Sequence, residues 1–567
     1  MRIRNLILAV ILCWSTGNAQ GHYPEDLFTS PLDIPVIPAG TFGELRSNHF
    51  HSGLDIKTQQ REGLPVYAIG NGYVSRIKVS HWGFGKVLYV HHPEGYTSVY
   101  AHLQKFSPGI EAYVKKRQYE KETYEIELFP ESDALVLQKK DLIGYSGNTG
   151  SSGGPHLHFE IRENSAQKPI NPMLFGMDIK DSKPPVVNGV YAYPLSDSAQ
   201  VNQSNKPLQL FLRSQEDGSF LADTLYAEGD IGFGIDTHDV QDFTYNKNGI
   251  YTLEMSVNDS LLLSYDFETF SFDETAYINT LIDYEHYALS GQRIQRCFVM
   301  PYNRLSIYRQ KVNNGIITIK DGAACTVLLK ARDFQNNESM IQIPVIGKKQ
   351  PVLYKKEIPL TGTYLEAGAE NRYDLGAVSV NFPPHTFYHN FYIDLKDNGD
   401  GTYHIHHKGI PARNYFTLRF DVSHLSPEER KKSFIARLND DNKPVYVSTE
   451  KNGNAFTAST KNLGTYTLAE DHEPPSVRPK NFKNNQWLSN YTQLALEIED
   501  NMSGIKDYRA TVNGEWILTE YEPKTRTLVY NFSDGIVKKG PKYLLEVVVT
   551  DNVGNITTFK STFYRKQ

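Results

Sequence analysis

The sequence has few cysteines, no run of basic residues and no long apolar stretch beyond its first residues. After a predicted leader, only Cys297 and Cys325 of the three cysteines remain, and two cysteines carry no disulfide framework. A formal net charge of −6 without a Lys/Arg run gives no electrostatic footprint for nucleic acid. No later stretch approaches the ~20 apolar residues of a membrane helix. These absences exclude nucleic-acid binding and a transmembrane segment.

The first residues are typical of an export signal. Arg2 and Arg4 form a basic start, an apolar run follows from Leu6 to Trp14, and small residues lead to a cleavage site after Ala19. The run is too short to span a bilayer. Leu12 stands before Cys13 where lipidation normally requires a small residue, so we expect a cleaved signal peptide, residues 1–19, and an exported protein.

The composition favours a mostly-β chain of several domains. The 36 Tyr and 28 Phe among 567 residues, with frequent Thr, Val and Ile, suit pleated and half-buried strands. A chain of this length exceeds one hydrophobic core. We expect an N-terminal β domain followed by three β-sandwich-like modules. The expected boundaries are 20–176, with a Lys/Glu/Tyr-rich insertion at about 111–140, then 177–348, 355–470 and 471–567.

Two of these modules begin and end alike. The segment 181–187, Asp-Ser-Lys-Pro-Pro-Val-Val, recurs at 471–477 as Asp-His-Glu-Pro-Pro-Ser-Val, and a Pro pair suits a linker between domains. Each module later has an apolar strand followed by an Asp/Asn turn, at 333–337 and 551–555, which signals a hairpin. The modules 177–348 and 471–567 resemble immunoglobulin-like β-sandwiches. A turn alone lacks the six oxygens of a calcium site, so none is assigned at 551–555.

Five residues of the N-terminal domain form a pattern that carries chemistry. His51 and Asp55 lie four apart, and His156 and His158 are separated by one residue. In a strand, His156 and His158 point to one side and Leu157 and Phe159 to the other, into a core. His102 lies in another strand-like run. Imidazole and carboxylate are zinc ligands, and a catalytic zinc keeps one position open for water; other histidines can move protons.

The sequence resembles the LytM/lysostaphin-type metallopeptidases of family M23. The resemblance rests on His51-x-x-x-Asp55, Tyr100-x-His102 and Gly154-Pro-His-Leu-His-Phe-Glu160, together with Arg46 and the turn Ser146-Gly-Asn-Thr-Gly150. It covers about a quarter of the chain. It implies that His51, Asp55 and His158 bind Zn²⁺ and that His102 and His156 assist catalysis. The insertion at 111–140 departs from the family pattern, so its effect on the substrate groove is open.

The resemblance implies a zinc-dependent endopeptidase that hydrolyses peptide cross-links of bacterial peptidoglycan. The alternative is a non-catalytic cell-wall scaffold that recruits or activates other hydrolases. We expect an exported protein in the periplasm or at the cell surface, with a Gram-negative envelope favoured and envelope proteins as possible partners of the C-terminal modules. The bond that is cut, the ligand of those modules, the oligomeric state and any autoinhibition are not determined by the sequence.

Several other residues keep two interpretations. Glu160 follows His158 at the i+2 position and either orients a ligand or is a surface carboxylate. Cys297 and Cys325 form either a bridge between two strands or two buried thiols. His81, His91 and His92 are interpreted as structural residues. His404, His406 and His407 are interpreted as an exposed strand face, with metal binding by the His-x-His pattern as the alternative.

Overall fold

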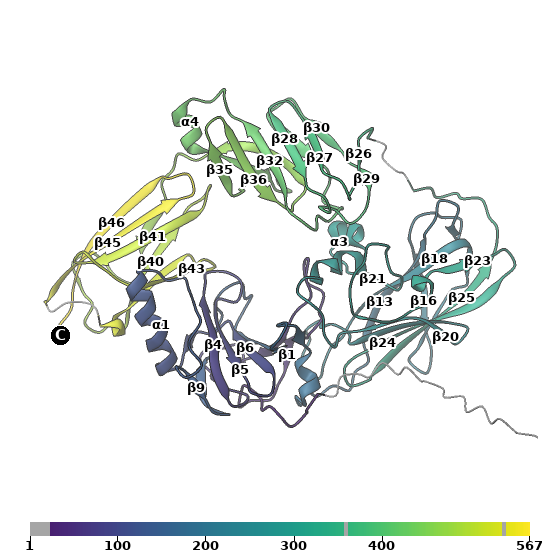
Figure 1. Ribbon diagram of the computed structural model, residues 1–567, viewed down its shortest axis with the longest axis horizontal. Helices are drawn as coiled ribbons and strands as arrows, with labels where there is room; N and C mark the ends of the chain where they lie inside the picture. Colours follow the sequence, from purple (N-terminus) through teal and green to yellow (C-terminus); the bar gives the residue numbers. More distant parts are fainter. Residues whose placement is uncertain (1–22, 357–360, 536–539, 567) are drawn as a thin grey trace, which may run out of the picture.

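A computed structural model describes residues 23–356, 361–535 and 540–566; the predicted signal peptide and Cys13 lie outside the described residues. Strands dominate the described part of the chain, and its helices are few and short. The mostly-β prediction is therefore confirmed. No helix in the described ranges is long and apolar enough to cross a membrane. The chain forms a ring of four β-rich units in which the last unit returns to the first (Figure 1).

The N-terminal domain is built on one antiparallel sheet with the strand order β1-β2-β11-β6-β5-β4-β8. A second, small sheet has the order β3-β10-β7. The strands of the large sheet are β1 (Pro38–Gly40), β2 (Leu54–Lys57), β4 (Gly72–Val79), β5 (Lys86–His91), β6 (Tyr96–Ala101), β8 (Ile126–Leu128) and β11 (His156–Glu163). Those of the small sheet are β3 (Pro65–Tyr67), β7 (Lys105–Phe106) and β10 (Leu142–Tyr145).

The central strand β11 lies between β2 and β6 and alternates as the sequence predicts. Leu157 and Phe159 are fully buried in the core of this domain, and Phe159 packs on Tyr100 of β6 with ring centroids 5.5 Å apart. Because alternate side chains leave a strand on opposite faces, His156 and His158 face away from that core. The apolar positions of β11 therefore fix the direction of its two histidines.

The segment predicted as an insertion forms a helix and two short strands on the side of the sheet. Helix α1 (Pro108–Lys121) starts with Pro at its first position and ends at Glu122, whose backbone is left-handed with φ 47°. Pro suits the first turn because its missing N–H has no partner there. β8 and β9 (Val136–Leu137) then extend the sheet beside β4. The insertion thus widens the sheet at the edge opposite β1 and β2.

The second module is a large β unit in which one long strand joins two groups of strands. β18 (Leu225–His238) pairs through its second half with β13 (Val186–Pro194) and through its first residues with β25 (Glu338–Gly347). Cys325 lies in β24 (Ala324–Arg332), and Cys297 follows β21 (Gln295–Arg296). Both are free thiols, which decides between the two interpretations of this pair.

The third and fourth modules each consist of two sheets. Those of the third module have the orders β27-β28-β32-β36-β35 and β30-β31-β37-β33-β34, and those of the fourth have the orders β38-β40-β44-β43 and β39-β46-β45-β41-β42. The strands that are not used below are β27 (Asn371–Asp374), β28 (Val378–Phe382), β30 (Leu395–Asp397), β31 (Thr402–Ile405), β32 (Phe416–Asp421), β33 (Ser433–Leu438), β34 (Pro444–Tyr446), β35 (Thr449–Asn452), β36 (Ala455–Thr460), β39 (Gln486–Trp487), β40 (Gln493–Glu499), β41 (Ile505–Val512) and β42 (Glu515–Trp516). Each module has its own buried apolar cluster, as expected when alternating strands bury one face. The strands used below are β37 (Gly464–Glu470), β38 (Ser476–Pro479), β43 (Thr519–Glu522), β44 (Thr527–Asn531), β45 (Lys542–Asp551) and β46 (Ile556–Tyr564).

The fourth module contacts the N-terminal domain through the insertion. Leu518 is buried within the N-terminal core cluster, and Trp516 packs edge-on against Tyr119 of α1 at 5.2 Å. Lys115 of α1 forms an ion pair with Asp534 at 2.7 Å. The insertion is therefore the platform on which the C-terminal module lies, which the sequence did not indicate (Figure 1).

Candidate metal centre

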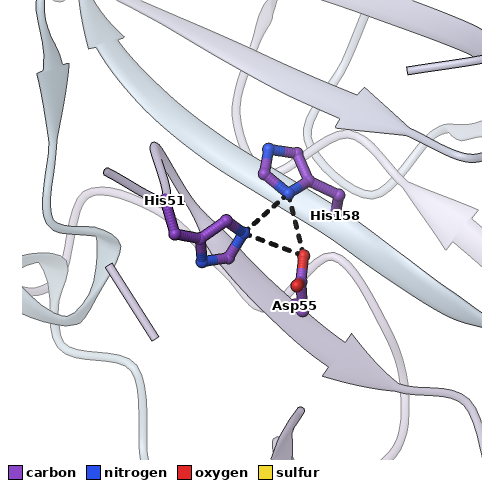
Figure 2. A group of neighbouring side chains, drawn as sticks. All are labelled: His51, Asp55 and His158. Atoms are coloured by element: carbon purple, nitrogen blue, oxygen red, sulfur yellow. Dashed lines mark hydrogen bonds and ion pairs between the residues drawn. The ribbon is translucent and has the colours of Figure 1, made fainter. Parts of the chain in front are cut away.

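Two histidines and an aspartate from separate segments meet in the N-terminal sheet. His51 precedes β2, Asp55 lies in β2 and His158 lies in β11 (Figure 2). The distances are 3.0 Å from His51 Nε2 to Asp55 Oδ1, 2.8 Å from Asp55 Oδ1 to His158 Nδ1 and 3.0 Å between the two nitrogens. The strands bring them together because β11 pairs with β2 with His158 opposite Asp55. Tetrahedral zinc with bonds of about 2.0–2.1 Å separates its ligands by only slightly more.

The hydrogen bond that each imidazole makes on the side away from Asp55 determines which of its two nitrogens carries the proton. His51 Nδ1 lies 2.8 Å from the carbonyl oxygen of Thr41 and donates to it. His158 Nε2 lies 2.8 Å from Glu160 Oε1 and donates to that carboxylate. A neutral imidazole carries one proton, so when both rings are neutral, as metal binding requires, His51 Nε2 and His158 Nδ1 present lone pairs to Asp55 Oδ1. Three lone pairs at this separation repel one another unless a cation lies among them, and the donor set fits zinc.

Asp55 uses its two oxygens for different partners. Oδ1 faces the histidines, whereas Oδ2 lies 3.3 Å from Arg46 Nη2, which also contacts Glu44 Oε2 at 3.1 Å. Burial raises the pKa of Asp55, but the charge of His51 and hydrogen bonds from His156 and His158 outweigh it and hold the pKa well below the usual range. The carboxylate is therefore ionised at neutral pH and offers one free oxygen to a metal.

Glu160 supports His158 from behind. Its carboxylate is fully buried and accepts from Ser52 Oγ at 2.6 Å as well as from His158, while its other oxygen accepts from Arg162. Burial raises the pKa of Glu160, but the Arg162 charge and the His158 hydrogen bond lower it to about 2. Glu160 is thus not a surface carboxylate; it fixes the tautomer and the orientation of His158.

In the absence of a metal, His158 holds a proton strongly. Burial lowers the pKa of the ring, but hydrogen bonds to Asp55 and Glu160 outweigh it and raise the pKa to about 9. Metal binding must displace this proton, because a ligand nitrogen offers its lone pair to the metal. The metal centre is therefore a place where a proton and a divalent ion compete.

His102 and His156 lie beside the three residues. Their ring centroids are 4.8 Å apart, and His156 Nε2 is 3.4 Å from Asp55 Oδ1. His102 Nδ1 donates to the carbonyl of Thr149 at 2.8 Å, which leaves Nε2 as an acceptor. Burial, followed by the charges of His158 and His156, lowers the His102 pKa to about 3, so the ring is neutral at neutral pH.

The backbone of His102 is itself unusual. It has φ 58°, the left-handed region that side chains other than Gly seldom adopt and that costs about 1–3 kcal/mol at functional positions. It directly follows Ala101, which is opposite His158 in the β6–β11 pairing. Strand β6 thus ends at Ala101, and the left-handed backbone of His102 directs its imidazole ring toward the metal centre. The five residues selected from the sequence therefore lie together.

Residues 49–119 match the family model for Peptidase family M23, and residues 362–471 match that for a Zu5-like domain. The chain carries an M23 peptidase domain. A DD-carboxypeptidase/endopeptidase, Mpg, of Neisseria meningitidis is 32% identical over 129 residues, 23% of each chain. The peptidoglycan DD-endopeptidase ShyA of Vibrio cholerae is 28% identical over 166 residues, 29% of this chain and 30% of that one. The chain thus spans under a third of the length of these relatives.

The catalytic domain of lysostaphin from Staphylococcus simulans is similar in structure to the M23 domain. Its sequence identity is 23%, over 25% of this chain and 93% of that chain, with a TM-score of 0.19.

Sequence reasoning missed the groups that orient the histidines of the M23 domain. The carbonyls of Thr41 and Thr149 carry no side-chain signal, and Ser52 becomes a partner of Glu160 only when β2 and β11 pair. Arg162 lies two residues after Glu160 on the same strand, so its spacing was a signal that could have been used. The histidines set aside have other contacts. His92 bonds to the Asn71 carbonyl and Ser98 Oγ at 2.7 Å each, as a structural residue does. His406 is 3% exposed, so the exposed strand face predicted for it is wrong.

Proposed function

We propose that the M23 domain is a zinc-dependent endopeptidase that hydrolyses peptide cross-links of bacterial peptidoglycan. The observation that carries the proposal is the convergence of His51 Nε2, Asp55 Oδ1 and His158 Nδ1 with two further histidines beside them. The printed names of the relatives, DD-endopeptidase and DD-carboxypeptidase/endopeptidase, support this substrate class. Their similarity covers 23% and 29% of this chain, so the C-terminal modules enter the proposal only as positioning elements.

In this proposal, His51, Asp55 and His158 hold Zn²⁺. When bound, the ion supplies Lewis-acid polarisation of the scissile carbonyl and lowers the pKa of water. His102 Nε2, unprotonated while Nδ1 donates to Thr149, accepts the proton of the attacking water. His156 Nδ1 lies 2.8 Å from the carbonyl oxygen of Gly154, which holds the ring with Nε2 toward the metal centre. In its imidazolium form the ring also carries a proton on Nε2, and that proton would stabilise the negative charge that develops on the carbonyl oxygen.

Alanine variants separate metal binding from proton transfer. Asp55→Ala and His158→Ala lose zinc and hydrolysis together, whereas His102→Ala keeps zinc and loses about 100- to 10,000-fold in rate. His91→Ala is the matched control, because it removes an imidazole of β5 that lies outside the metal centre. The assay is the release of monomers from cross-linked muropeptide dimers by the purified protein. Retained digestion of cell walls by Asp55→Ala would contradict the proposal.

The same assay tests the scaffold alternative and the bond that is cut. A scaffold would bind peptidoglycan without releasing monomers, and a zinc analysis with and without chelator would show whether the complete ligand set is used. Activity confined to pentaglycine bridges would redirect the substrate from D,D cross-links. We place the enzyme in the periplasm or at the cell surface of a Gram-negative envelope. Fractionation of cells that express the full chain tests that location.

A further inference from the structure

Two buried carboxylates and a half-buried one meet where the second module begins. Asp181 lies in the linker before β13, Asp239 follows β18 and Asp333 follows β24. One oxygen of each lies within 4.8 Å of the others. Asp239 and Asp333 are each 1% exposed. Because a buried charge is costly unless it is paired, this group requires a compensating partner.

Two of these oxygens have no hydrogen-bond donor. Asp239 Oδ1 and Asp181 Oδ2 are shielded from solvent, and no donor among the described residues reaches either atom. The other oxygens are occupied: Asp181 Oδ1 accepts from the Lys183 amide at 3.1 Å, Asp239 Oδ2 accepts from Gln241, and Asp333 accepts twice from Asn337. Within the described ranges, no Lys or Arg forms an ion pair with any of the three. The negative charge on the two oxygens without a donor is therefore not offset by any hydrogen bond or ion pair among the described residues.

The electrostatic state of the group confirms the imbalance. Burial, with the charges of Asp181 and Asp333, raises the pKa of Asp239 to about 8, and burial raises that of Asp333 to about 6. Either protons or a cation must therefore neutralise the group at neutral pH. Carboxylate oxygens on three segments are the ligands that hard divalent ions prefer.

The fourth module repeats the arrangement. Asp471, Asp500 and Asp551 also lie within 4.8 Å of one another. Asp471 precedes a Pro pair as Asp181 does, and Asp551 precedes an Asn by four residues as Asp333 does. In this copy Lys432 hydrogen-bonds to Asn555, which itself donates to Asp551 at 2.7 Å. A cationic side chain therefore lies beside the second group, and the first is the one whose charge is uncompensated.

We propose that Asp181, Asp239 and Asp333 bind a hard divalent cation, Ca²⁺ in the first instance. The cation joins the linker from the M23 domain to two strand ends of the second module and so fixes the junction between them. No calcium was assigned to the equivalent turn at 551–555 from the sequence, because a turn alone supplies too few oxygens. At the turn 333–337 the structure adds carboxylates from two other segments. Water completes the six or more oxygens that such an ion requires.

A calcium titration of the full chain, kept saturated with zinc, tests the site. Ca²⁺ raises the melting temperature of the wild type by several degrees, and Asp239→Asn binds one ion fewer by calorimetry. Asp242→Asn, which removes a neighbouring carboxylate outside the group, is the matched control. Without calcium, Asp239→Asn is more stable than the wild type at neutral pH, because it removes a carboxyl group that must take up a proton on folding. Asp333→Asn serves as a second variant in case Asp239→Asn fails to fold.

Two results would overturn the cation site. One is a wild type that takes up no Ca²⁺. The other is an Asp239→Asn variant with unchanged calcium stoichiometry. In the first case, stabilisation by Asp239→Asn would show that protons neutralise the group instead. The measurement needs no hydrolysis and is independent of the proposed function.

A separate observation concerns the loop that orients the two assisting histidines. The turn between β43 and β44 carries Lys524, whose Nζ donates to the carbonyls of Asn148 and Ser152, the latter at 3.2 Å. Between these two carbonyls lies Thr149, whose own carbonyl holds His102. Ser152 Oγ lies 3.2 Å from His156 Nδ1. One ammonium of the fourth module thus fixes both ends of this loop.

An ion pair also joins the fourth module to the M23 domain beside this loop. Lys86 is 5% exposed; its Nζ contacts Glu520 Oε2 at 2.7 Å, and its amide donates to Thr149 Oγ1 at 3.0 Å. We infer that Lys524 is a positioning residue that acts on His102 and His156 through the loop 148–152. This inference rests on the proposed function, because it assigns the fourth module a part in that reaction.

The test uses the full chain with Lys524→Met. We expect a kcat at least tenfold lower, with zinc affinity unchanged and partial rescue by Lys524→Arg. Lys560→Met is the matched control, because that lysine pairs with Glu546 on β45 and touches no part of the loop. Hydrogen exchange of residues 149–152 gives a readout without activity and rises in Lys524→Met.

The outcomes separate this inference from the proposed function. Wild-type activity that is unchanged in Lys524→Met would overturn the positioning role. An inactive wild type whose loop still exchanges faster in Lys524→Met would instead contradict the proposed function and leave the structural contact in place.

Discussion

Glu160→Gln tests the link between strand pairing and metal affinity. Glu160 is fully buried and accepts from His158 Nε2 at 2.8 Å and from Ser52 Oγ at 2.6 Å. Glutamine keeps one acceptor oxygen but places an amide donor where the other carboxylate oxygen stood. The new amide N–H group faces either Arg162 or the pair His158 and Ser52. In both orientations a donor meets another donor, so the hydrogen bond on that side is lost. The substitution therefore loosens the hold on His158 while it preserves side-chain volume.

The expected loss of zinc affinity is about 10- to 100-fold, or about 1.4–2.7 kcal/mol, as for other groups that orient a ligand from behind. Arg162, 7% exposed, is left without its carboxylate. Removal of one partner of a buried ion pair costs about 3–5 kcal/mol of folding stability. Zinc-free Glu160→Gln should therefore unfold at a clearly lower urea concentration than the wild type.

Zinc affinity is measured by competition with a chromogenic chelator, and stability by urea unfolding of the zinc-free protein. Glu163→Gln is the control, because Glu163 lies at the exposed end of the same strand. A folded Glu160→Gln protein that binds zinc as tightly as the wild type would refute the role assigned to Glu160.

Four further outcomes follow from the structure. Apparent zinc affinity rises about tenfold per pH unit up to the His158 pKa of about 9 and then levels off, because binding displaces that proton; calorimetry over this range checks it. The zinc-free protein loses the corresponding stability as the pH rises from 6.5 through about 9, which thermal melting measures. Phe159→Ala destabilises the fully buried core by about 3–5 kcal/mol in urea unfolding. Cys297, fully buried, reacts with a thiol reagent only after unfolding, whereas half-buried Cys325 reacts in the folded protein, as labelling and mass spectrometry show.

The metal centre could be predicted because its side chains belong to short local patterns. The spacing of His156 and His158 with Leu157 between them fixes a strand with two imidazoles on one face, and Phe159 confirms the core side. The same applies to the mostly-β class, which follows from Tyr, Phe and β-branched residues. Such features depend on near neighbours, and the sequence carries them directly.

The acidic groups and the contacts of the fourth module could not be predicted in this way. Asp181, Asp239 and Asp333 have no common spacing, and Lys524 lies 372 residues from Ser152. No local pattern relates such positions, since only the packing of whole domains brings them together.

The sequence by itself determined the strand class and the expectation of an export signal, because both depend on residue types and short spacings. Its resemblance to family M23 implied the candidate zinc ligands. Only the tertiary structure decided that Glu160 is buried behind His158, that Cys297 and Cys325 stay unpaired and that the insertion carries the C-terminal module. Those facts depend on burial and on distances between remote segments, which arise when the sheets pair and the ring of domains forms (Figure 1).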